Sequence, residues 1–358
     1  MTEREKLQES ADRVISWFRA NGKSLPWRED PTPYSVWISE IMLQQTRIEA
    51  VIPYFRRFLR ELPDVQSLAA VDEDRLMKLW QGLGYYSRAR NLKKAAVLIM
   101  EKFGGILPSE AKELRGLPGI GDYTAGAIAS IAYGKGEPAV DGNVMRVFTR
   151  LTACPDDVAL PETKKKITEA LKAVYPVGEE ASFLTQGWME VGELVCLPNG
   201  APLCERCPLS ELCEAKKEGL IDLYPVKSPK KERVAEERTV VVLREGDRFS
   251  VEKRGEKGLL AGMWQFPNAE GRLDEEGVRA YVSSVGAIPL SVKPLGESVH
   301  IFTHREWRMT GYLVDVDGVP DPFRQATKEE LAQKYAVPSA FRYYLSAIMR
   351  KGKADEKE

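Results

Sequence analysis

The sequence predicts a protein of two domains, an all-α domain followed by an α+β domain. Apolar residues recur at helical spacing through most of residues 1–222, whereas β-branched runs with rough alternation dominate residues 239–350. Between them, residues 223–238 are charged, contain prolines and hold almost no large apolar side chains, which is typical of a linker. At 358 residues with 43% hydrophobic content, the chain is long enough for two cores.

Helical periodicity in the first domain is clearest over residues 75–103 and 162–175, and glycine or proline pairs separate the helices. In the second domain we expect strands over 239–243, 249–254 and 307–316, with a helix or two between them. The charged tail, 351–358, is expected to be disordered.

Four of the five cysteines lie close together in the sequence, in the pattern C-x7-C-x2-C-x5-C over residues 196–213. Four soft thiolates on a short loop suit an iron–sulfur cluster, and a tetrahedral zinc is the alternative. The polar first residues do not resemble a signal peptide, so we expect a cytoplasmic protein in which disulfides are disfavoured. Cys154 stands apart and is expected to be a small buried side chain.

The charge balance predicts no polyanionic partner by itself. The chain has 52 basic and 53 acidic residues, and it contains no apolar run long enough to span a bilayer. A nucleic-acid function would therefore depend on local patches, of which two are visible: Arg56, Arg57 and Arg60, and Arg88, Arg90, Lys93 and Lys94. Such a run is also typical of an ordinary solvated helix face.

The segment LPGIG, residues 117–121, predicts a tight turn between two helices. Gly119 and Gly121 would let backbone N–H groups point outward at the start of the second helix, where the helix dipole favours an anion. Such a turn holds a phosphate without reading base sequence. The alternative is an ordinary helix corner.

Two carboxylates are expected to lie in different environments. Glu40 has apolar neighbours on nearly every side of a predicted helix, so burial should raise its pKa and make it a candidate general acid, unless the helix turns it toward water. Asp141 precedes a helix, where it could simply be the N-cap, and helix-terminal donors would keep it ionised. An acid and an anion together are what cleavage of a glycosidic bond requires.

The LPGIG turn, the four cysteines and the stretch PAVDGNVMRVFTR resemble the helix-hairpin-helix DNA glycosylases of the endonuclease III superfamily over residues 10–220. The segments SEIMLQQT, GLGYYSRARNL, GDYTAGA and DGNVMR resemble the MutY-type adenine DNA glycosylases, and LLAGMWQFP at 259–267 resembles their Nudix-like C-terminal domain. This resemblance implies a base excision repair enzyme that acts on double-stranded DNA at the nucleoid. It would flip an adenine mispaired with 8-oxoguanine or guanine and remove it by hydrolysis of the glycosidic bond.

The resemblance also implies roles for single residues. Glu40 would protonate adenine at N7, Asp141 would stabilise or capture the oxocarbenium ion, and Tyr123 and Asn143 would support this chemistry. Bifunctional relatives carry lysine at the position of Tyr123, so we expect no lyase activity. Gln45 and Tyr85 would enter the duplex. The other implied contacts are Trp27, Arg28, Leu43 and Gln186 for the flipped base, Thr46, Arg88, Leu117, Gly119 and Gly121 for DNA, and Phe302, Thr303 and His304 for 8-oxoguanine.

For cofactors, the resemblance implies a [4Fe-4S] cluster on Cys196, Cys204, Cys207 and Cys213, although the first gap holds seven residues where six are usual. It also allows a cation at the hairpin. The second domain lacks the glutamate-rich helix that holds magnesium in Nudix hydrolases, so it should recognise and not hydrolyse; His300 and His304 lie in a β-rich segment that disfavours zinc. We expect a monomer. The rival interpretations are an endonuclease III-like glycosylase/lyase and a non-catalytic damage-binding protein.

Overall fold

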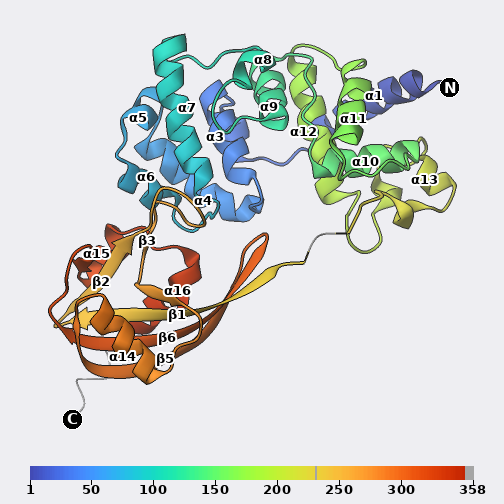
Figure 1. Cartoon of the computed structure of the whole chain (residues 1–358). Coiled ribbons are helices and arrows are strands. Elements are labelled where there is room, and N and C mark those ends of the chain that lie inside the picture. The colour runs from blue at the N-terminus through green and yellow to red at the C-terminus, as the bar shows by residue number, and fades with distance from the viewer. Residues whose placement is uncertain (230–231, 351–358) are drawn as a thin grey trace. The chain divides into compact units, whose positions relative to one another are not determined.

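A computed structural model describes residues 1–229 and 232–350 (Figure 1). The tail predicted to be disordered, 351–358, lies outside the described residues. The chain forms two compact units, one of residues 1–71 and 90–229 and one of residues 72–89 and 230–358. Residues 72–89 therefore group with the second unit, which a first domain running without interruption over 1–222 did not anticipate. No helix in the described ranges is long and apolar enough to cross a bilayer.

The first unit is helical, as predicted. Its elements are α1 (Glu3–Asn21), α2 (Pro26–Glu29), α3 (Pro33–Leu43), α4 (Ile48–Glu61), α5 (Val65–Ala70), most of α7 (Ser87–Phe103), α8 (Ala111–Leu114), α9 (Asp122–Tyr133), α10 (Gly142–Thr152), α11 (Pro161–Lys172), α12 (Glu179–Leu194), η1 (Cys204–Arg206), α13 (Glu214–Lys217) and η2 (Ile221–Leu223). One core joins apolar faces of α1, α10, α11 and α12, with Trp188 of α12 almost fully buried in it.

Helices α9 and α12 lie side by side and run in opposite directions (Figure 1). At one end the Gly178 amide donates a hydrogen bond to the Gly134 carbonyl at 2.7 Å, and one to two turns away the hydroxyls of Thr185 and Ser130 lie 2.8 Å apart. The small residues of α9 allow this close approach, because alanine and glycine keep two helix backbones near each other. The helix pair forms one wall of the site described below.

The second unit is a mixed sheet covered by helices, which confirms the α+β prediction. Its elements are α6 (Glu73–Trp80), β1 (Val234–Glu245), β2 (Arg248–Lys253), β3 (Trp264–Gln265), β4 (Asn268–Glu270), α14 (Glu275–Ser284), β5 (Ile288–Ile301), β6 (Arg305–Asp317), β7 (Arg324–Ala326), α15 (Lys328–Gln333), η3 (Ser339–Phe341) and α16 (Arg342–Arg350). The strand order is β3-β2-β1-β6-β5, with β4 beside β1 and β7 beside β2, and β1 and β6 are parallel.

Alternation along β1 explains why both faces of the sheet are covered. Val240 and Val242 enter a core with residues of α15 and α16, whereas Val241 and Leu243 enter a second core with residues of α14. Successive strand residues point to opposite faces, so a continuous run of β-branched residues requires apolar layers on both sides.

One boundary and one strand differ from the prediction. Strand β1 begins at Val234, so the predicted linker, 223–238, is shorter; its residues 230–231 lie outside the described part of the chain. Strand β5 was not among the strands predicted, although its end near His300 was expected to be β-rich. It contains Pro289, Pro294 and Gly296, and its pairing with β6 shifts register near each of these positions. Prolines remove ladder donors and the register shifts interrupt the alternation on which strand prediction depends.

Candidate active site

Glu40 is a buried acid on α3 with one close donor. Its side chain is only 6% exposed, and Tyr123 in the first turn of α9 donates a hydrogen bond from Oη to Glu40 Oε2 at 2.7 Å. Burial raises the pKa of Glu40 to about 7 and the negative charge of Asp141 adds to this, whereas the Tyr123 hydrogen bond and the positive charge of Arg28 oppose it. A carboxyl group in this state can carry a proton at neutral pH and give it to a substrate.

Asp141 is the N-cap of α10 and lies within electrostatic reach of Glu40. Its Oδ1 accepts a hydrogen bond from the Val144 amide at 2.8 Å, and its Oδ2 accepts one from Asn143 Nδ2 at 2.9 Å. Burial nevertheless raises the pKa of Asp141, against these donors and the charge of Arg146. The partial removal of this carboxylate from water acts against its donors, and the expectation that these donors keep Asp141 ionised stays a prediction.

Asn143 is held on two further sides. Arg146 Nη2 donates to Asn143 Oδ1 at 2.9 Å and to the Gly192 carbonyl at 2.8 Å. A Cβ atom at Gly192 would lie 2.6 Å from the Cβ of Asn143, so α10 and α12 can approach this closely only because position 192 is glycine. Sequence analysis gave Arg146 no role, although it is three residues after Asn143 and so lies on the same helix face.

Arg28 lies within electrostatic reach of Glu40. Its Nη1 donates to Glu190 Oε1 at 2.5 Å and to the Lys23 carbonyl at 2.8 Å, and Glu190 is almost completely buried. Glu190 was also missed by sequence analysis, although it follows Gln186 by four residues on α12, a spacing that puts both on one helix face. Trp27 is buried against Phe55 instead, with ring centroids 5.5 Å apart.

The hairpin turn connects α8 to α9. Gly119 has φ of +79°, which disfavours any residue with a side chain, and a Cβ there would also lie only 2.7 Å from the Cβ of Asn91. Both the backbone conformation and the close contact therefore require glycine. Gly121 has extended backbone and open space beside it, so the turn itself does not demand glycine at that position. The side chain of Leu117 is buried, which leaves only its backbone available to a phosphate.

The two residues expected to enter the duplex both have unusual backbone conformations. Gln45 has φ of 58° and Tyr85 has φ of 46°, and both side chains are exposed. Non-glycine residues in this region are uncommon and concentrate at functional sites. Thr46 and Leu43, close to Gln45 in the chain, are half-buried.

Arg88 supports Tyr85 from inside the second unit. Its Nη2 donates to the carbonyls of Leu83 and Gly84 at 3.0 and 3.1 Å, and its guanidinium lies over the rings of Trp80 and Tyr85. Burial lowers the pKa of Arg88 to about 10. The Arg88 guanidinium is thus turned into the protein, where it braces Tyr85, and the DNA contact expected for Arg88 stays a prediction.

The loop expected to read 8-oxoguanine joins β5 to β6 in the same unit. Phe302 packs edge-on against the fully buried Trp307, with centroids 4.9 Å apart, while Thr303 and His304 are exposed. The hydroxyl groups of Thr303 and Tyr85 lie 3.1 Å apart, within hydrogen-bonding distance. The segments around Tyr85 and Thr303 are far apart in the sequence, and they meet at two residues that are both expected to contact DNA.

The four clustered thiols lie beside α10. Arg150 Nη1 donates to Cys196 Sγ at 3.3 Å, and Cys213 Sγ lies 3.3 Å from the Arg150 carbonyl. Burial raises the pKa of Cys207 to about 12, and the charges of the other three thiols add to it, so all four lie within reach of one another's field. The described residues form no group of three or more ligating side chains close enough for one metal ion. Four soft thiolates suit an iron–sulfur cluster by donor chemistry.

Two family models match this chain. Residues 38–176 match a model described as HhH-GPD superfamily base excision DNA repair protein, and residues 239–347 match a NUDIX domain. The first range contains Glu40, Tyr123, the hairpin and Asp141.

Curated relatives cover most of the chain. The adenine DNA glycosylase of Buchnera aphidicola subsp. Schizaphis graminum is 38% identical over 261 residues, which cover 73% of this chain and 75% of the relative. The adenine DNA glycosylase of Homo sapiens is 31% identical and covers 92% of this chain and 73% of the relative.

Solved structures match the helical part. A thermostable thymine-DNA glycosylase aligns with a TM-score of 0.55 at 26% identity, covering 60% of this chain and 98% of that one. An endonuclease III in a non-covalent complex with DNA aligns with a TM-score of 0.52 at 26% identity, covering 62% of this chain and 99% of that one. Together with the buried Glu40–Tyr123 pair, the hairpin and the Nudix-like second unit, these relatives establish that the chain belongs to the adenine DNA glycosylase family.

Proposed function

We propose that this chain is a monofunctional glycosylase. It releases adenine from duplex DNA by hydrolysis of the glycosidic bond when the adenine is opposite 8-oxoguanine or guanine. The observation that carries the proposal is the pair of carboxyl groups, the buried Glu40 and the half-buried Asp141, with Tyr123 donating to the first. Glycosidic cleavage requires a proton for the leaving group and a negative charge beside the sugar cation, and the two groups can supply one each.

Glu40 is the proposed general acid. Its pKa of about 7 means that a large fraction carries a proton at neutral pH, whereas an exposed glutamate would be almost fully ionised. Transfer of this proton to N7 of adenine turns the base into a neutral leaving group. Tyr123 donates to the carboxylate that remains and so keeps it in place.

Asp141 is the proposed stabiliser of the sugar cation. The Val144 amide and the Asn143 side chain each donate to one of its oxygens, which fixes the carboxylate in one orientation. A fixed negative charge stabilises a developing oxocarbenium ion without having to reorganise as the bond breaks. Water then attacks the sugar, because no lysine stands at position 123 to form a Schiff base.

We also propose roles for the hairpin, for four residues that would contact DNA and for the four clustered cysteines. The hairpin would hold a phosphate, and a cation at its carbonyls is compatible with the family. Gln45 and Tyr85 would fill the gap that the flipped base leaves, and Thr303 and His304 would read the opposite base. Cys196, Cys204, Cys207 and Cys213 would hold a [4Fe-4S] cluster, which supplies a rigid brace for the loop over 196–213 when bound. The proposed location is the cytoplasm, at the nucleoid.

The deciding experiment is a single-turnover assay on duplexes with adenine opposite 8-oxoguanine, with and without alkali. We expect strand breaks only after alkali. A duplex with thymine glycol opposite adenine is the control, and direct nicking there would replace this proposal with an endonuclease III-like lyase. Glu40→Gln should abolish base release while DNA binding is retained; equal base release by this variant and the wild type would exclude the proposed acid.

A further inference from the structure

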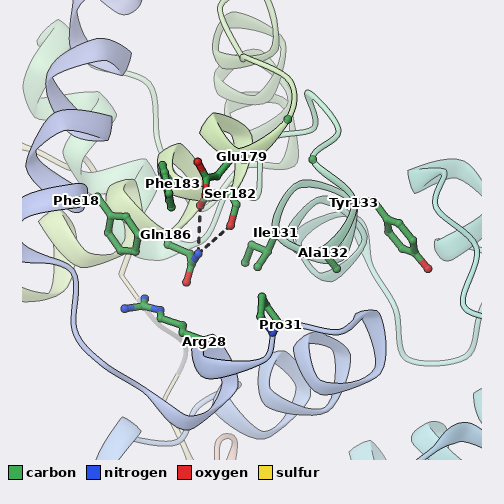
Figure 2. Close-up of a pocket in the computed structure, with 12 residues that line it drawn as sticks. Phe18, Arg28, Pro31, Ile131, Ala132, Tyr133, Glu179, Ser182, Phe183 and Gln186 are labelled. Carbon is green, nitrogen blue, oxygen red and sulfur yellow. Dashed lines mark hydrogen bonds between the residues drawn. The ribbon is translucent and has the colours of Figure 1, made fainter.

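The first unit contains a cavity of about 520 Å³ that is lined by Arg28 and Gln186 among other residues (Figure 2). Both are expected contacts of the flipped base, so this cavity is assigned no ligand beyond the adenine already proposed. The second unit contains a different group of polar side chains, at the base of the loop over residues 302–304. Part of this group lies in the segment that was predicted to be a linker, 223–238.

Glu236 of β1 binds two residues at the start of β6, directly after the loop. Its Oε2 accepts a hydrogen bond from Trp307 Nε1 at 2.9 Å, and its Oε1 accepts one from Arg305 Nη1. Arg238 Nη2 is a further donor to Glu236 Oε2, at 3.4 Å. The parallel pairing of the two strands puts Glu236 directly opposite Trp307. A single carboxylate of β1 is therefore bonded to both Arg305 and Trp307.

Trp307 is the surface on which the loop packs. Its side chain is fully buried, and the ring of Phe302 lies edge-on against it with centroids 4.9 Å apart. The guanidinium of Arg238 lies 4.4 Å from the centroid of the Trp307 ring and that of Arg254 lies 5.8 Å from it. Rotation of the indole would break its hydrogen bond to Glu236. The orientation of the surface that Phe302 contacts thus depends on Glu236.

The backbone of β1 also holds the loop. The Val234 amide donates a hydrogen bond to the His304 carbonyl at 3.1 Å. The Phe302 amide donates one to the Arg305 carbonyl at 2.8 Å and so closes the turn. Strand β1 begins beside the turn that joins β5 to β6, with Val234 opposite Arg305 (Figure 1). The first residues of β1, which were predicted to be linker, are therefore part of the support of this loop.

Glu236 is charged at neutral pH, whereas its neighbour Glu237 faces the other way. Burial acts against the charge of Glu236, but the donors Trp307, Arg305 and Arg238 outweigh it and lower the pKa of this carboxyl group. The side chain of Glu236 is only 20% exposed. Glu237 is exposed, on the opposite face of the strand. Two adjacent glutamates therefore differ in their contact with the base of the loop.

We propose that Glu236 is a positioning residue for recognition of the base opposite adenine. The inference rests on the proposed function, in which Thr303 and His304 read that base. 8-Oxoguanine differs from guanine by an oxygen at C8 and a proton at N7, so a displaced loop loses the distinction while the other DNA contacts remain. Glu236 fixes the loop before DNA binds, which removes the cost of ordering it in the complex.

The test compares single-turnover rates of the full-length protein on adenine opposite 8-oxoguanine and adenine opposite guanine. In Glu236→Gln the ratio of the two rates should fall about tenfold, the effect expected for loss of a hydrogen bond to a charged group. The rate on the guanine duplex should stay within about twofold of the wild type, because the catalytic residues are unchanged. Glu237→Gln makes the same chemical change on the other face and should keep the wild-type ratio.

A double variant separates positioning from a general loss of stability. Glu236→Gln should reduce the ratio little further when Thr303 is already valine, because both changes act through one loop. Thermal melts verify that each variant is folded. Should Glu236→Gln fail to fold, Arg305→Gln replaces it under the same criteria, because it removes the same ion pair at an exposed position.

The proposal is overturned by an unchanged ratio in Glu236→Gln, by equal losses on the two duplexes, or by losses that add fully to those of Thr303→Val. A wild type that releases adenine equally from both duplexes overturns it as well, since there is then no recognition for Glu236 to support. The proposed function fails separately, if the wild type releases adenine from neither duplex.

Discussion

Tyr123 donates a hydrogen bond to Glu40 across 2.7 Å, from the first turn of α9 to the middle of α3. Burial raises the pKa of Glu40 and this hydrogen bond lowers it, and the balance lies at about 7. A lysine at position 123 would form a covalent intermediate, whereas tyrosine adjusts the acidity of its neighbour. In the proposed mechanism, this one side chain distinguishes hydrolysis by water from Schiff-base chemistry.

Tyr123→Phe should raise the pKa of Glu40 above about 7, because the variant loses the donor that favours the charged form. In the proposed mechanism the base-release rate depends on protonated Glu40, so the decline of this rate at alkaline pH should move to higher pH. Single-turnover rates across a pH series measure this shift. A decline that stays in place, or moves to lower pH, would show that the hydroxyl does not act on Glu40.

The raised pKa of Glu40 should also appear in the stability of the protein. The native state holds a proton that the unfolded chain releases at its ordinary pKa, so this contribution is complete below pH 4.5 and is lost as pH rises through about 7. Across that window, the free energy of unfolding of the wild type should fall relative to Glu40→Gln by up to about 1.4 kcal/mol per pH unit. Urea titrations of both proteins at pH 5 and pH 8 provide the comparison, and parallel pH profiles would contradict the assignment.

Asp141 serves as a helix cap and as a proposed catalytic anion, and two variants separate these roles. Asn is as good an N-cap as Asp, so Asp141→Asn should keep its thermal stability but lose base release. Asp141→Ala should lose base release and also about 1 kcal/mol of stability. Thermal melts and single-turnover rates on the same preparations test both. Full activity in Asp141→Asn would mean that the residue is only a cap.

Tyr85 and Thr303 share one hydrogen bond, so removing either hydroxyl removes the same interaction. Tyr85→Phe and Thr303→Val should each weaken the preference for adenine opposite 8-oxoguanine over adenine opposite guanine, and the double variant should be hardly worse than either. The ratio of the two cleavage rates is the measurement. Fully additive losses would mean that the two hydroxyls act separately.

Cys207→Ser should lose the iron and the acid-labile sulfide of the purified protein together and should lower its thermal stability, because metal binding contributes to folding. Cys154→Ser is the matched control, since Cys154 lies outside the cysteine cluster in the sequence and should leave the iron content unchanged. Elemental analysis distinguishes the alternatives. One zinc per chain in the wild type would refute the iron–sulfur proposal.

The fold was predictable where local patterns are regular. Helical spacing located the first unit and the run from Thr239 to Leu243 located the centre of the sheet. Strand β5 escaped because its prolines and register shifts break the alternation, and it is held by pairing along β6, a contact that no local pattern records. The grouping of residues 72–89 with the second unit depends on long-range contacts in the same way.

In the candidate site, too, some residues were predictable from local sequence and others depend on contacts between distant segments. Glu40 and Asp141 could be chosen because each stands in a distinctive local setting. The bracing of Tyr85 by Arg88 could not, since a basic residue beside aromatic residues predicts a phosphate contact as readily as a buried stack. The roles of Arg146 and Glu190 depend on contacts between helices: Arg146 of α10 bonds to the Gly192 carbonyl of α12, and Glu190 of α12 pairs with Arg28 of α2.

Gly192 has no functional group, yet a side chain at this position would reach a residue of the proposed active site. Even the methyl group of alanine would press on Asn143, which holds the Asp141 carboxylate, and a packed interior transmits such pressure because it has little room to yield. A change that looks conservative in an alignment would therefore behave as damage to the active site. We therefore expect a substitution of Gly192 to reduce activity in the way that substitutions of Glu40 and Asp141 do.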